Sequence, residues 1–387
     1  MNILMFNMSE YSEWMRRDIP NRNRHILFNL LKNDQVEKIL AVDFMPFTFK
    51  RSARIYKDNF IADFGVKTLR RNLTSKLTKI SDKLYVHSTI KTAFDDEDGA
   101  YNKIDKDLAI LGMNKYILWS YYPMFSGYFD HFKTATASVF DAVDNWMEHP
   151  NFEAHYRDRL RKNYEVIDKK ASPIFTVSKD LLDIFPENKN KHWIPNGVDC
   201  YHFLHGKSGA ISKKVSELKR PIIGYIGIIQ ERLDFELISI LAKNNPDKSF
   251  VLGGPVWKGV DLSNLEKLPN IYFPGKVNYN ESPKVMAEFD VGIIPHRVNK
   301  FTSSMNPLKL YEYLAVGLPV VTTPVAGTEE FAGHVKQAST PKEFQSAIEE
   351  ALSQGKKKEL VEERKKIAKK NSWRQKVGEM LRLIQSK

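Results

Sequence analysis

The sequence predicts an α/β protein of two domains, each built around a parallel sheet. A chain of 387 residues, 42% of them hydrophobic, is long enough to form two such domains and to bury a core in each. In both halves, short apolar runs alternate with helical patterns, as they do in parallel α/β units. The two series are separated by residues 201–219, a polar segment with glycine and serine but no periodicity, which we expect to be a linker.

The first half is expected to contain seven strands, because it has seven short apolar runs with polar or turn residues at their ends. They are Asn2–Asn7, Lys38–Asp43, Lys83–His87, Tyr116–Ser120, Ala137–Asp141, Pro173–Val177 and Lys191–Ile194. We place the N-terminal domain at residues 1–200.

One segment of the first half, Val66–Leu84, has an apolar residue at every third or fourth position and lysine or arginine between them. This spacing predicts a basic amphipathic helix. Two interpretations of residues 66–84 stay open. The segment is either a surface helix that covers the sheet, or a contact with the anionic surface of a membrane.

The second half is expected to contain five strands, each followed by a helix, within a C-terminal domain at residues 220–371. The strands are Pro221–Ile226, Ser249–Gly253, Asn270–Phe273, Val291–Pro295 and Pro319–Thr323. A last helix is expected over residues 372–387, because its apolar side chains recur at helical spacing. Its apolar stripe is Trp373, Val377, Met380, Leu381 and Ile384.

Charge and cysteine content restrict the setting of the protein. Lysine and arginine outnumber acidic residues by 59 to 47, and such a surface attracts phosphates, nucleic acids or anionic lipids. RNA-binding signatures are absent, so we expect no nucleic-acid partner. The single cysteine, Cys200, fits a reducing compartment. With no secretory signal and no apolar stretch long enough for a bilayer, we expect a cytoplasmic protein, peripheral at the inner face of the membrane if residues 66–84 bind there.

The strand expected at 291–295 and the residues after it carry the most specific chemistry. A helix is expected to begin with Asn306 as its N-cap and Pro307 at its first position. The free N–H groups of such a helix end attract a phosphate. Lys309 and Glu312 are three residues apart and share a helix face, so a lysine could meet the phosphate and a glutamate the ribose. The alternative is an ordinary surface ion pair between them.

These residues resemble the donor-binding signature of the group 1, or family 4, glycosyltransferases. In that signature a helix with a glutamate precedes Ala-x-Gly-x-Pro-Val-Val, here Ala315–Val321. Three further segments are similar to the same family, in the expected order: 194–199, 224–237 and 270–277. The resemblance implies the GT-B fold, in which two Rossmann-like domains face a cleft and the C-terminal helix crosses back to the N-terminal domain.

The resemblance also implies a set of donor-binding residues in the C-terminal domain. Gly227 would let the backbone approach the diphosphate, and Arg232 and Lys309 would bind its oxygens. Val277 would meet the base and Glu312 the ribose. Ser304 stands where many members have a second glutamate near the transferred sugar, and Asn306 opens the helix beside it.

The N-terminal domain is expected to supply the acceptor site and the catalytic base. Asp141 and Asp144 lie three residues apart at the end of an expected strand. A carboxylate at this place could deprotonate an acceptor hydroxyl. Asp144 is the first choice and Asp141 the second. The alternative is that both acids cap the following helix. His87, His131 and His202 are expected to be structural, and no metal or other cofactor is expected, because cations and a helix end can hold the diphosphate.

The resemblance is to bacterial enzymes that build polysaccharides of the teichuronic-acid type. It implies transfer of a sugar from a nucleotide-sugar, with a UDP-sugar favoured, to a glycan or lipid-linked acceptor. Two alternatives remain: a nucleotide-sugar epimerase or hydrolase on the same fold, and a non-catalytic protein that binds anionic surfaces. Whether the reaction retains or inverts the anomeric centre stays open.

Overall fold

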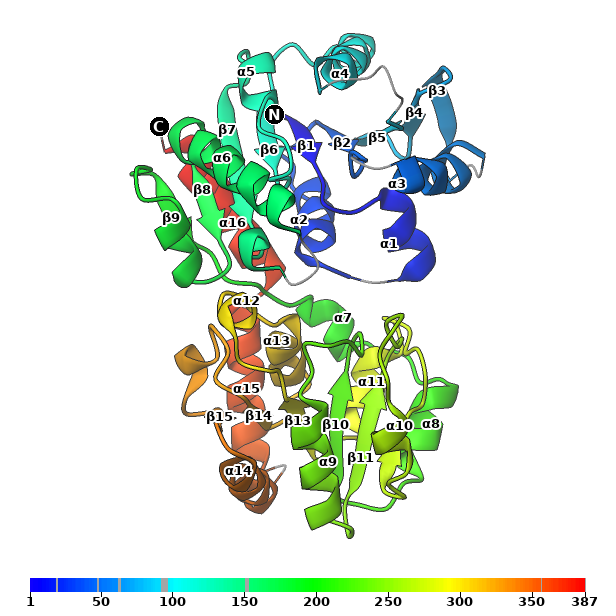
Figure 1. The fold of residues 1–387 in the computed structure, drawn as a ribbon, viewed down its shortest axis with the longest axis vertical. Helices are drawn as coiled ribbons and strands as arrows, with labels where there is room; N and C mark the ends of the chain where they lie inside the picture. Colours follow the sequence, from blue (N-terminus) through cyan, green and yellow to red (C-terminus); the bar gives the residue numbers. More distant parts are fainter. Residues whose placement is uncertain are drawn as a thin grey trace. The chain divides into compact units, whose positions relative to one another are not determined.

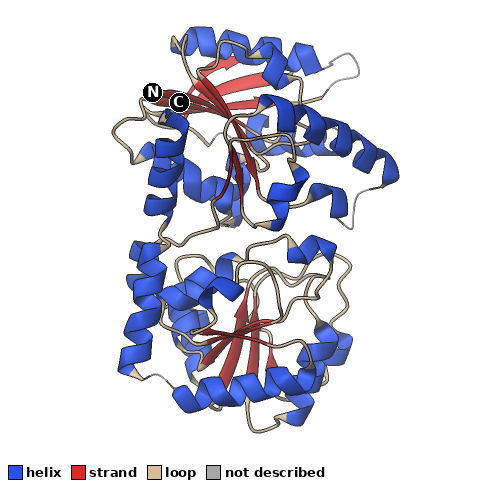
Figure 2. Cartoon of the chain, turned by 90° about the vertical axis from the view of Figure 1, so that its left-hand side faces the viewer, coloured by secondary structure: helices blue, strands red, loops and turns tan. Residues whose placement is uncertain are grey.

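The computed structural model describes residues 1–18, 20–46, 49–61, 64–91, 97–149, 153–355 and 357–386. The chain divides into two compact units (Figure 1). Unit 1 is Met1–Ile194 together with Val377–Lys387, and unit 2 is Pro195–Lys376. In each unit helices lie on both sides of a central sheet (Figure 2). None of the described helices is both long and apolar enough to cross a membrane.

Unit 1 contains a nine-stranded sheet in the order β3-β4-β5-β2-β1-β6-β7-β8-β9. The strands from β5 to β9 are parallel, and the seven expected strands are all present. Their bounds are β1 Asn2–Phe6, β2 Lys38–Val42, β5 Leu84–Thr89, β6 Ile117–Ser120, β7 Ala137–Ala142, β8 Ile174–Thr176 and β9 Lys191–Trp193. The helices are α1 Tyr11–Arg17, α2 Arg22–Leu31, α3 Phe49–Ile55, η1 Tyr56–Ile61, α4 Glu97–Leu111, α5 Tyr128–His131, η2 Trp146–Glu148, α6 Ala154–Lys170 and η3 Asp180–Ile184.

The helix expected over Val66–Leu84 is wrong, because this segment forms an antiparallel hairpin. Its strands are β3 (Lys67–Arg71) and β4 (Ser75–Lys79), and β4 pairs in turn with β5. The side-chain oxygen of Asn72 accepts hydrogen bonds from the backbone N–H groups of Thr74 and Ser75 at 2.9 and 2.7 Å, which fixes the turn. β4 pairs with both β3 and β5, so the segment is held in strands and the helical spacing of its apolar residues has no structural counterpart.

Unit 2 contains a six-stranded parallel sheet in the order β12-β11-β10-β13-β14-β15. Five strands were expected, and β15 was not. The strands are β10 Ile222–Ile226, β11 Ser249–Gly253, β12 Ile271–Tyr272, β13 Val291–Ile294, β14 Val320–Thr322 and β15 Val335–Gln337. The helices are α7 Cys200–Leu204, α8 Ala210–Ser216, α9 Phe235–Asn244, α10 Ser263–Glu266, α11 Ser282–Ala287, α12 Lys300–Ser303, α13 Leu308–Ala315, η4 Glu329–Phe331, α14 Pro341–Gln354, α15 Lys358–Lys370 and α16 Trp373–Gln385.

The segment expected to be a linker, residues 201–219, is folded into unit 2 instead. It contains most of α7 and all of α8. The backbone N–H groups of Ile211 and Ser212 both donate to the carboxylate of Glu281 at 2.8 Å, so the start of α8 is fixed to the start of α11. The absence of apolar periodicity therefore reflected short helices and not a flexible connection.

The last helix, α16, begins in unit 2 and continues into unit 1 from Val377 onward. Its apolar side chains in unit 1, Val377, Met380, Leu381 and Ile384, are buried. The helix expected at the end of the chain thus belongs to both units.

Candidate functional site

Three glycine loops of unit 2 pack backbone against backbone at the carboxyl ends of β10, β11 and β12. The N–H of Gly227 donates to the carbonyl of Gly253, and the N–H of Gly254 to the carbonyl of Gly275, both at 2.8 Å. A Cβ atom at Gly254, where φ is 149°, would collide with the carbonyl oxygen of Gly227. This edge of a parallel sheet is where α/β proteins bind ligands. Because glycine has no side chain, the backbone of these loops stays accessible.

Two positively charged side chains lie at this edge without a carboxylate partner. The ammonium of Lys309, on α13, lies 5.2 Å from the centre of the Tyr225 ring, and a Cβ atom at Gly227 would collide with it. The guanidinium of Arg232 lies 4.0 Å from the sulfur of Met305. Neither cation forms an ion pair with any residue that the structure describes. Unneutralised cations beside an accessible backbone form a site for an anion.

Glu312 lies on α13 one turn beyond Lys309. The ion pair considered for these two residues does not form, and the carboxylate of Glu312 has no hydrogen-bond or ion-pair partner within the described parts of the chain. Burial raises the pKa of Glu312, and the charge of Lys309 opposes that rise. A partly buried carboxylate without a partner is available to accept hydrogen bonds from hydroxyl groups of a ligand.

Asn306 does not cap α13 as expected. The helix begins at Leu308 with Pro307 as its N-cap, and Asn306 holds a distant segment instead. Its side-chain oxygen accepts from the N–H of Asn196 at 2.8 Å, and its carbonyl accepts from the Asn196 side chain at 2.5 Å. Asn306 therefore fixes the segment that enters unit 2 against the start of α13.

Ser304 and Val277 lie near the same edge in different settings. Ser304 is buried after α12, where its hydroxyl donates to the carbonyl of Phe301 at 2.8 Å. Val277 follows β12 and is partly exposed, and a Cβ atom at Gly253 would lie 3.0 Å from its methyl carbon. Val277 thus borders the glycine loops, whereas the Ser304 hydroxyl bonds to the backbone of the preceding helix α12.

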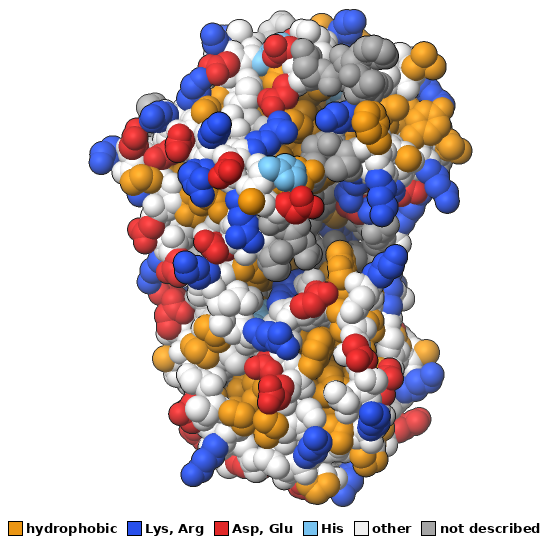
Figure 3. Space-filling view, in the orientation of Figure 1, with side chains coloured by type: hydrophobic (Ala, Val, Ile, Leu, Met, Phe, Trp, Pro, Cys, Tyr) orange, Lys and Arg blue, Asp and Glu red, His pale blue; other side chains and the backbone are white. Residues whose placement is uncertain are grey.

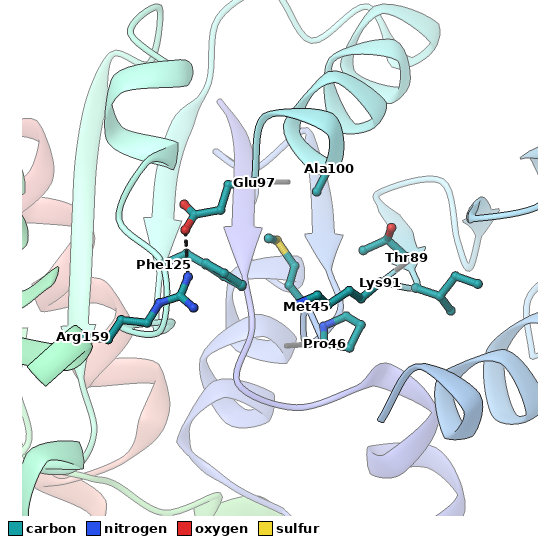
Figure 4. Close-up of a pocket in the computed structure, with 9 residues that line it drawn as sticks. Met45, Pro46, Thr89, Lys91, Glu97, Ala100, Phe125 and Arg159 are labelled. Atoms are coloured by element: carbon teal, nitrogen blue, oxygen red, sulfur yellow. Dashed lines mark hydrogen bonds and ion pairs between the residues drawn. The ribbon is translucent and has the colours of Figure 1, made fainter. Parts of the chain in front are cut away.

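A separate pocket of about 160 Å³ opens in unit 1, at the carboxyl ends of β2 and β5. Arg159 forms one wall (Figure 4): its guanidinium donates to Glu97 at 2.9 Å and lies 4.7 Å from the centre of the Phe125 ring. Glu97 also accepts from the hydroxyl of Tyr101 at 3.1 Å. The lining combines apolar and charged groups: Met45, Pro46, Thr89, Ile90, Lys91, Glu97, Ala100, Phe125 and Arg159.

The two candidate bases of unit 1 have different surroundings. Asp141 is fully buried on β7, and both of its carboxylate oxygens face the Nε of Arg22, at 3.0 and 3.1 Å. Burial raises the pKa of Asp141, and Arg22 opposes that rise. Asp144 follows β7 by two residues and is partly exposed. Neither acid caps the next helix, whose N-cap is Asn145 without a side-chain hydrogen bond. Of the two, Asp144 is the one that is accessible from solvent.

The three histidines considered in the sequence have structural partners, as expected. His87 and His131 bond to Asp107 and Asp105, both at 2.6 Å. His202 bonds to the carbonyl of Tyr279 at 2.8 Å and stacks on its ring.

His296 was not expected at the site. It comes two residues after β13, at the same carboxyl edge as Lys309. Burial, and then the positive charges of Arg232 and Lys309, lower the pKa of His296. Its position just after an expected strand is the signal that could have identified it.

Comparisons with known proteins show which family and which relatives the chain resembles. Residues 220–354 match the family described as glycosyl transferases group 1. The chain is 28% identical over 251 residues to the Bacillus subtilis protein TuaH, which is named as a teichuronic acid biosynthesis glycosyltransferase. The match covers 61% of this chain and 63% of TuaH, so it spans less than two thirds of that relative.

Solved structures resemble the chain over its whole length. Anabaena HepE, in complex with UDP and glucose, has a TM-score of 0.68 at 16% identity, with 100% of both chains covered. An Escherichia coli trehalose-6-phosphate protein bound with UDP-2-fluoro glucose has a TM-score of 0.66 at 12% identity, with 100% of this chain and 99% of that chain covered. The chain therefore has the GT-B fold of these structures, and residues 220–354 of its C-terminal unit are similar to the group 1 glycosyl transferases.

Proposed function

We propose that the protein is a glycosyltransferase that moves a sugar from a nucleotide-sugar, favouring a UDP-sugar, to a glycan or lipid-linked acceptor in cell-surface polysaccharide synthesis. The arrangement of Arg232, Lys309 and Glu312 is the observation that carries the proposal. Two cations without carboxylate partners suit the two phosphates of a nucleoside diphosphate, and a carboxylate without a partner suits ribose hydroxyls. The UDP in the HepE structure and the name of TuaH support the same donor and pathway.

The chemistry at this site is the breaking of the bond between the anomeric carbon and a diphosphate oxygen. As the bond breaks, negative charge grows on the diphosphate, and Lys309 and Arg232 stabilise it without a metal ion. An acceptor hydroxyl attacks the anomeric carbon and loses its proton. If the centre is inverted, Asp144 takes that proton. If the centre is retained, the leaving diphosphate takes it.

Unit 1 would then bind the acceptor. Its pocket beside Arg159 and Phe125 combines an apolar floor with charged groups, which suits an acceptor that has both apolar and polar parts (Figure 4).

We further propose that unit 1 contacts the inner face of an anionic membrane through the hairpin of residues 66–84. Val66 and Leu73 are 77% and 89% exposed, and Lys67 and Arg71 beside them are exposed as well. Hydrophobic and basic side chains lie together over this part of the molecule, at the upper right of Figure 3. Apolar side chains that enter the interface and cations that meet anionic headgroups are the two requirements for such binding.

The donor assignment is tested with Glu312→Gln, which keeps the size of the side chain and removes its charge. UDP binding is measured by calorimetry, with Glu236→Gln, an exposed glutamate of α9, as the control. Loss of a hydrogen bond to a charged group predicts affinity reduced by roughly tenfold or more, and no change in the control. Unchanged affinity in Glu312→Gln would contradict the donor assignment, because Glu312 is the residue expected to bind the ribose.

Incubation with UDP-sugar alone separates a transferase from an epimerase or hydrolase, which act without an acceptor.

A further inference from the structure

His296 is a buried histidine whose ring lacks hydrogen-bond partners. It is 3% exposed, and neither ring nitrogen bonds to any residue that the structure describes. A buried polar group without a partner costs about 1–3 kcal/mol, and few such groups occur in folded proteins. The ring therefore points to a partner that is not part of the chain.

The backbone around His296 places it within the anion site of unit 2. His296 forms an antiparallel bridge with Leu233, and the next residue, Arg297, donates its N–H to the carbonyl of Arg232 at 2.8 Å. From the neighbouring strand end, the hydroxyl of Thr323 donates to the carbonyl of His296 at 2.7 Å. His296 is thus fixed between the Arg232 loop and the end of β14.

The charges around His296 determine which kind of ligand its ring can bind. Burial, and then the positive charges of Arg232 and Lys309, hold the pKa of His296 well below its usual range. The ring is neutral near pH 7, so one nitrogen carries a hydrogen that it can donate. A cationic ligand would be repelled by Arg232 and Lys309, whereas an anion is attracted by both and accepts a hydrogen bond from the ring.

We propose that His296 contacts the donor, with its ring N–H donating to a diphosphate oxygen of the nucleotide-sugar beside Arg232 and Lys309. This contact rests on the proposed function, because the diphosphate is the anion that the function supplies. The neutral ring adds a directional hydrogen bond to the charge of the two cations. It therefore fixes the orientation of the leaving group, which a lysine ammonium acting as a point charge does less well.

The contact is tested by comparing the binding of UDP and of uridine, which has the same base and ribose but no phosphate. His296→Phe keeps a planar ring and removes both nitrogens. UDP affinity is expected to fall tenfold or more, because a hydrogen bond to a charged group is lost, while uridine affinity stays within twofold. His205→Phe, which changes an exposed histidine of the same unit, should alter neither. His296→Leu, with a smaller side chain, replaces the phenylalanine variant if that one does not fold.

The outcomes distinguish this contact from the proposed function itself. If the His296 variant weakens UDP and uridine by the same factor, the ring only maintains the shape of the site, and the contact is wrong. It is also wrong if the variant binds UDP as the wild type does, and in both cases the donor assignment stands. If the wild-type protein binds neither UDP nor another nucleoside diphosphate, the proposed donor is wrong, and the proposed contact of His296 is then wrong as well.

Discussion

At the scale of single residues, the two cations of the candidate donor site differ from two other cations of unit 2 in how they are paired. Arg220 lies 2.9 Å from the carboxylate of Asp290, and Lys248 lies 2.8 Å from that of Glu349. Lys309 and Arg232 have no such partner among the described residues. A partly buried cation loses hydration, and here no carboxylate offsets that loss. These two side chains are therefore available to bind a negatively charged ligand.

Lys309→Met is expected to reduce turnover more than donor binding. The lysine acts on charge that grows as the diphosphate leaves, so its removal should lower kcat by roughly a hundredfold to a thousandfold and UDP affinity by less. Steady-state kinetics and calorimetry on the same variant measure the two effects. Lys243→Met, which changes an exposed lysine of α9, should leave both unchanged. A loss of UDP affinity with kcat unchanged would instead show that Lys309 binds the ground state and the transition state equally.

The two acids of unit 1 are expected to respond differently to conversion into amides. Asp144→Asn removes the candidate base from a partly exposed position, so turnover should fall by about a hundredfold or more with little change in the melting temperature. Asp141→Asn removes the carboxylate charge that faces the buried guanidinium of Arg22, so it should destabilise the fold by about 3–5 kcal/mol. Activity assays and thermal unfolding separate the two effects. Near-normal turnover in a folded Asp144→Asn protein would place the base elsewhere or favour retention.

At the scale of elements, the sequence predicted those strands that can be recognised from residues close together in the chain. All the expected strands of unit 1 except β9 are short runs that are mostly buried in the sheet, and such runs are recognisable without knowledge of their neighbours. The hairpin β3–β4 was missed because its apolar residues happen to have helical spacing. Leu77 is buried while Leu73 is 89% exposed, so the pattern did not correspond to one face.

The candidate donor site shows the same division between local and distant contacts. Lys309 and Glu312 could be expected together, because they are one turn apart on one helix. The contact of Asn306 with Asn196 joins residues 110 positions apart, and the pair of Arg22 with Asp141 joins residues 119 apart. Such partners depend on how the sheets are assembled, and no spacing in a single sequence encodes them.

The hairpin gives a prediction for membrane binding. Leu73→Ser in its turn, or Val66→Ser at its base, should reduce flotation with anionic vesicles severalfold, because an exposed apolar side chain no longer enters the interface. Neither change should lower the melting temperature. Ile110→Ser, which changes an exposed apolar residue of α4, is the control. Binding should also weaken as salt rises. Flotation that is absent, or equal in the hairpin variants and the wild type, would leave the hairpin as a plain sheet edge.

At the scale of the whole molecule, each unit buries its own core, and α16 contributes to both. Trp373 is buried in unit 2, whereas Val377, Met380, Leu381 and Ile384 are buried in unit 1. The candidate donor site draws on unit 2 alone. A ligand that binds only the folded state stabilises the part of the chain that binds it. UDP should therefore stabilise unit 2 in particular.

Met380→Ala tests this division because it changes unit 1 through the shared helix. The side chain is fully buried, and its truncation should destabilise unit 1 by about 2–5 kcal/mol. For a unit of this size, each kcal/mol lowers the melting temperature by roughly 2–4 °C. Scanning calorimetry should show one transition moved down, while UDP at a hundredfold excess over its Kd adds about 2.7 kcal/mol to the other. Arg382→Ala, an exposed change in the same helix, should shift neither transition. If UDP instead raises the transition that Met380→Ala lowers, the donor binds to unit 1 or the units unfold together, and the placement of the donor site in unit 2 loses its thermodynamic support.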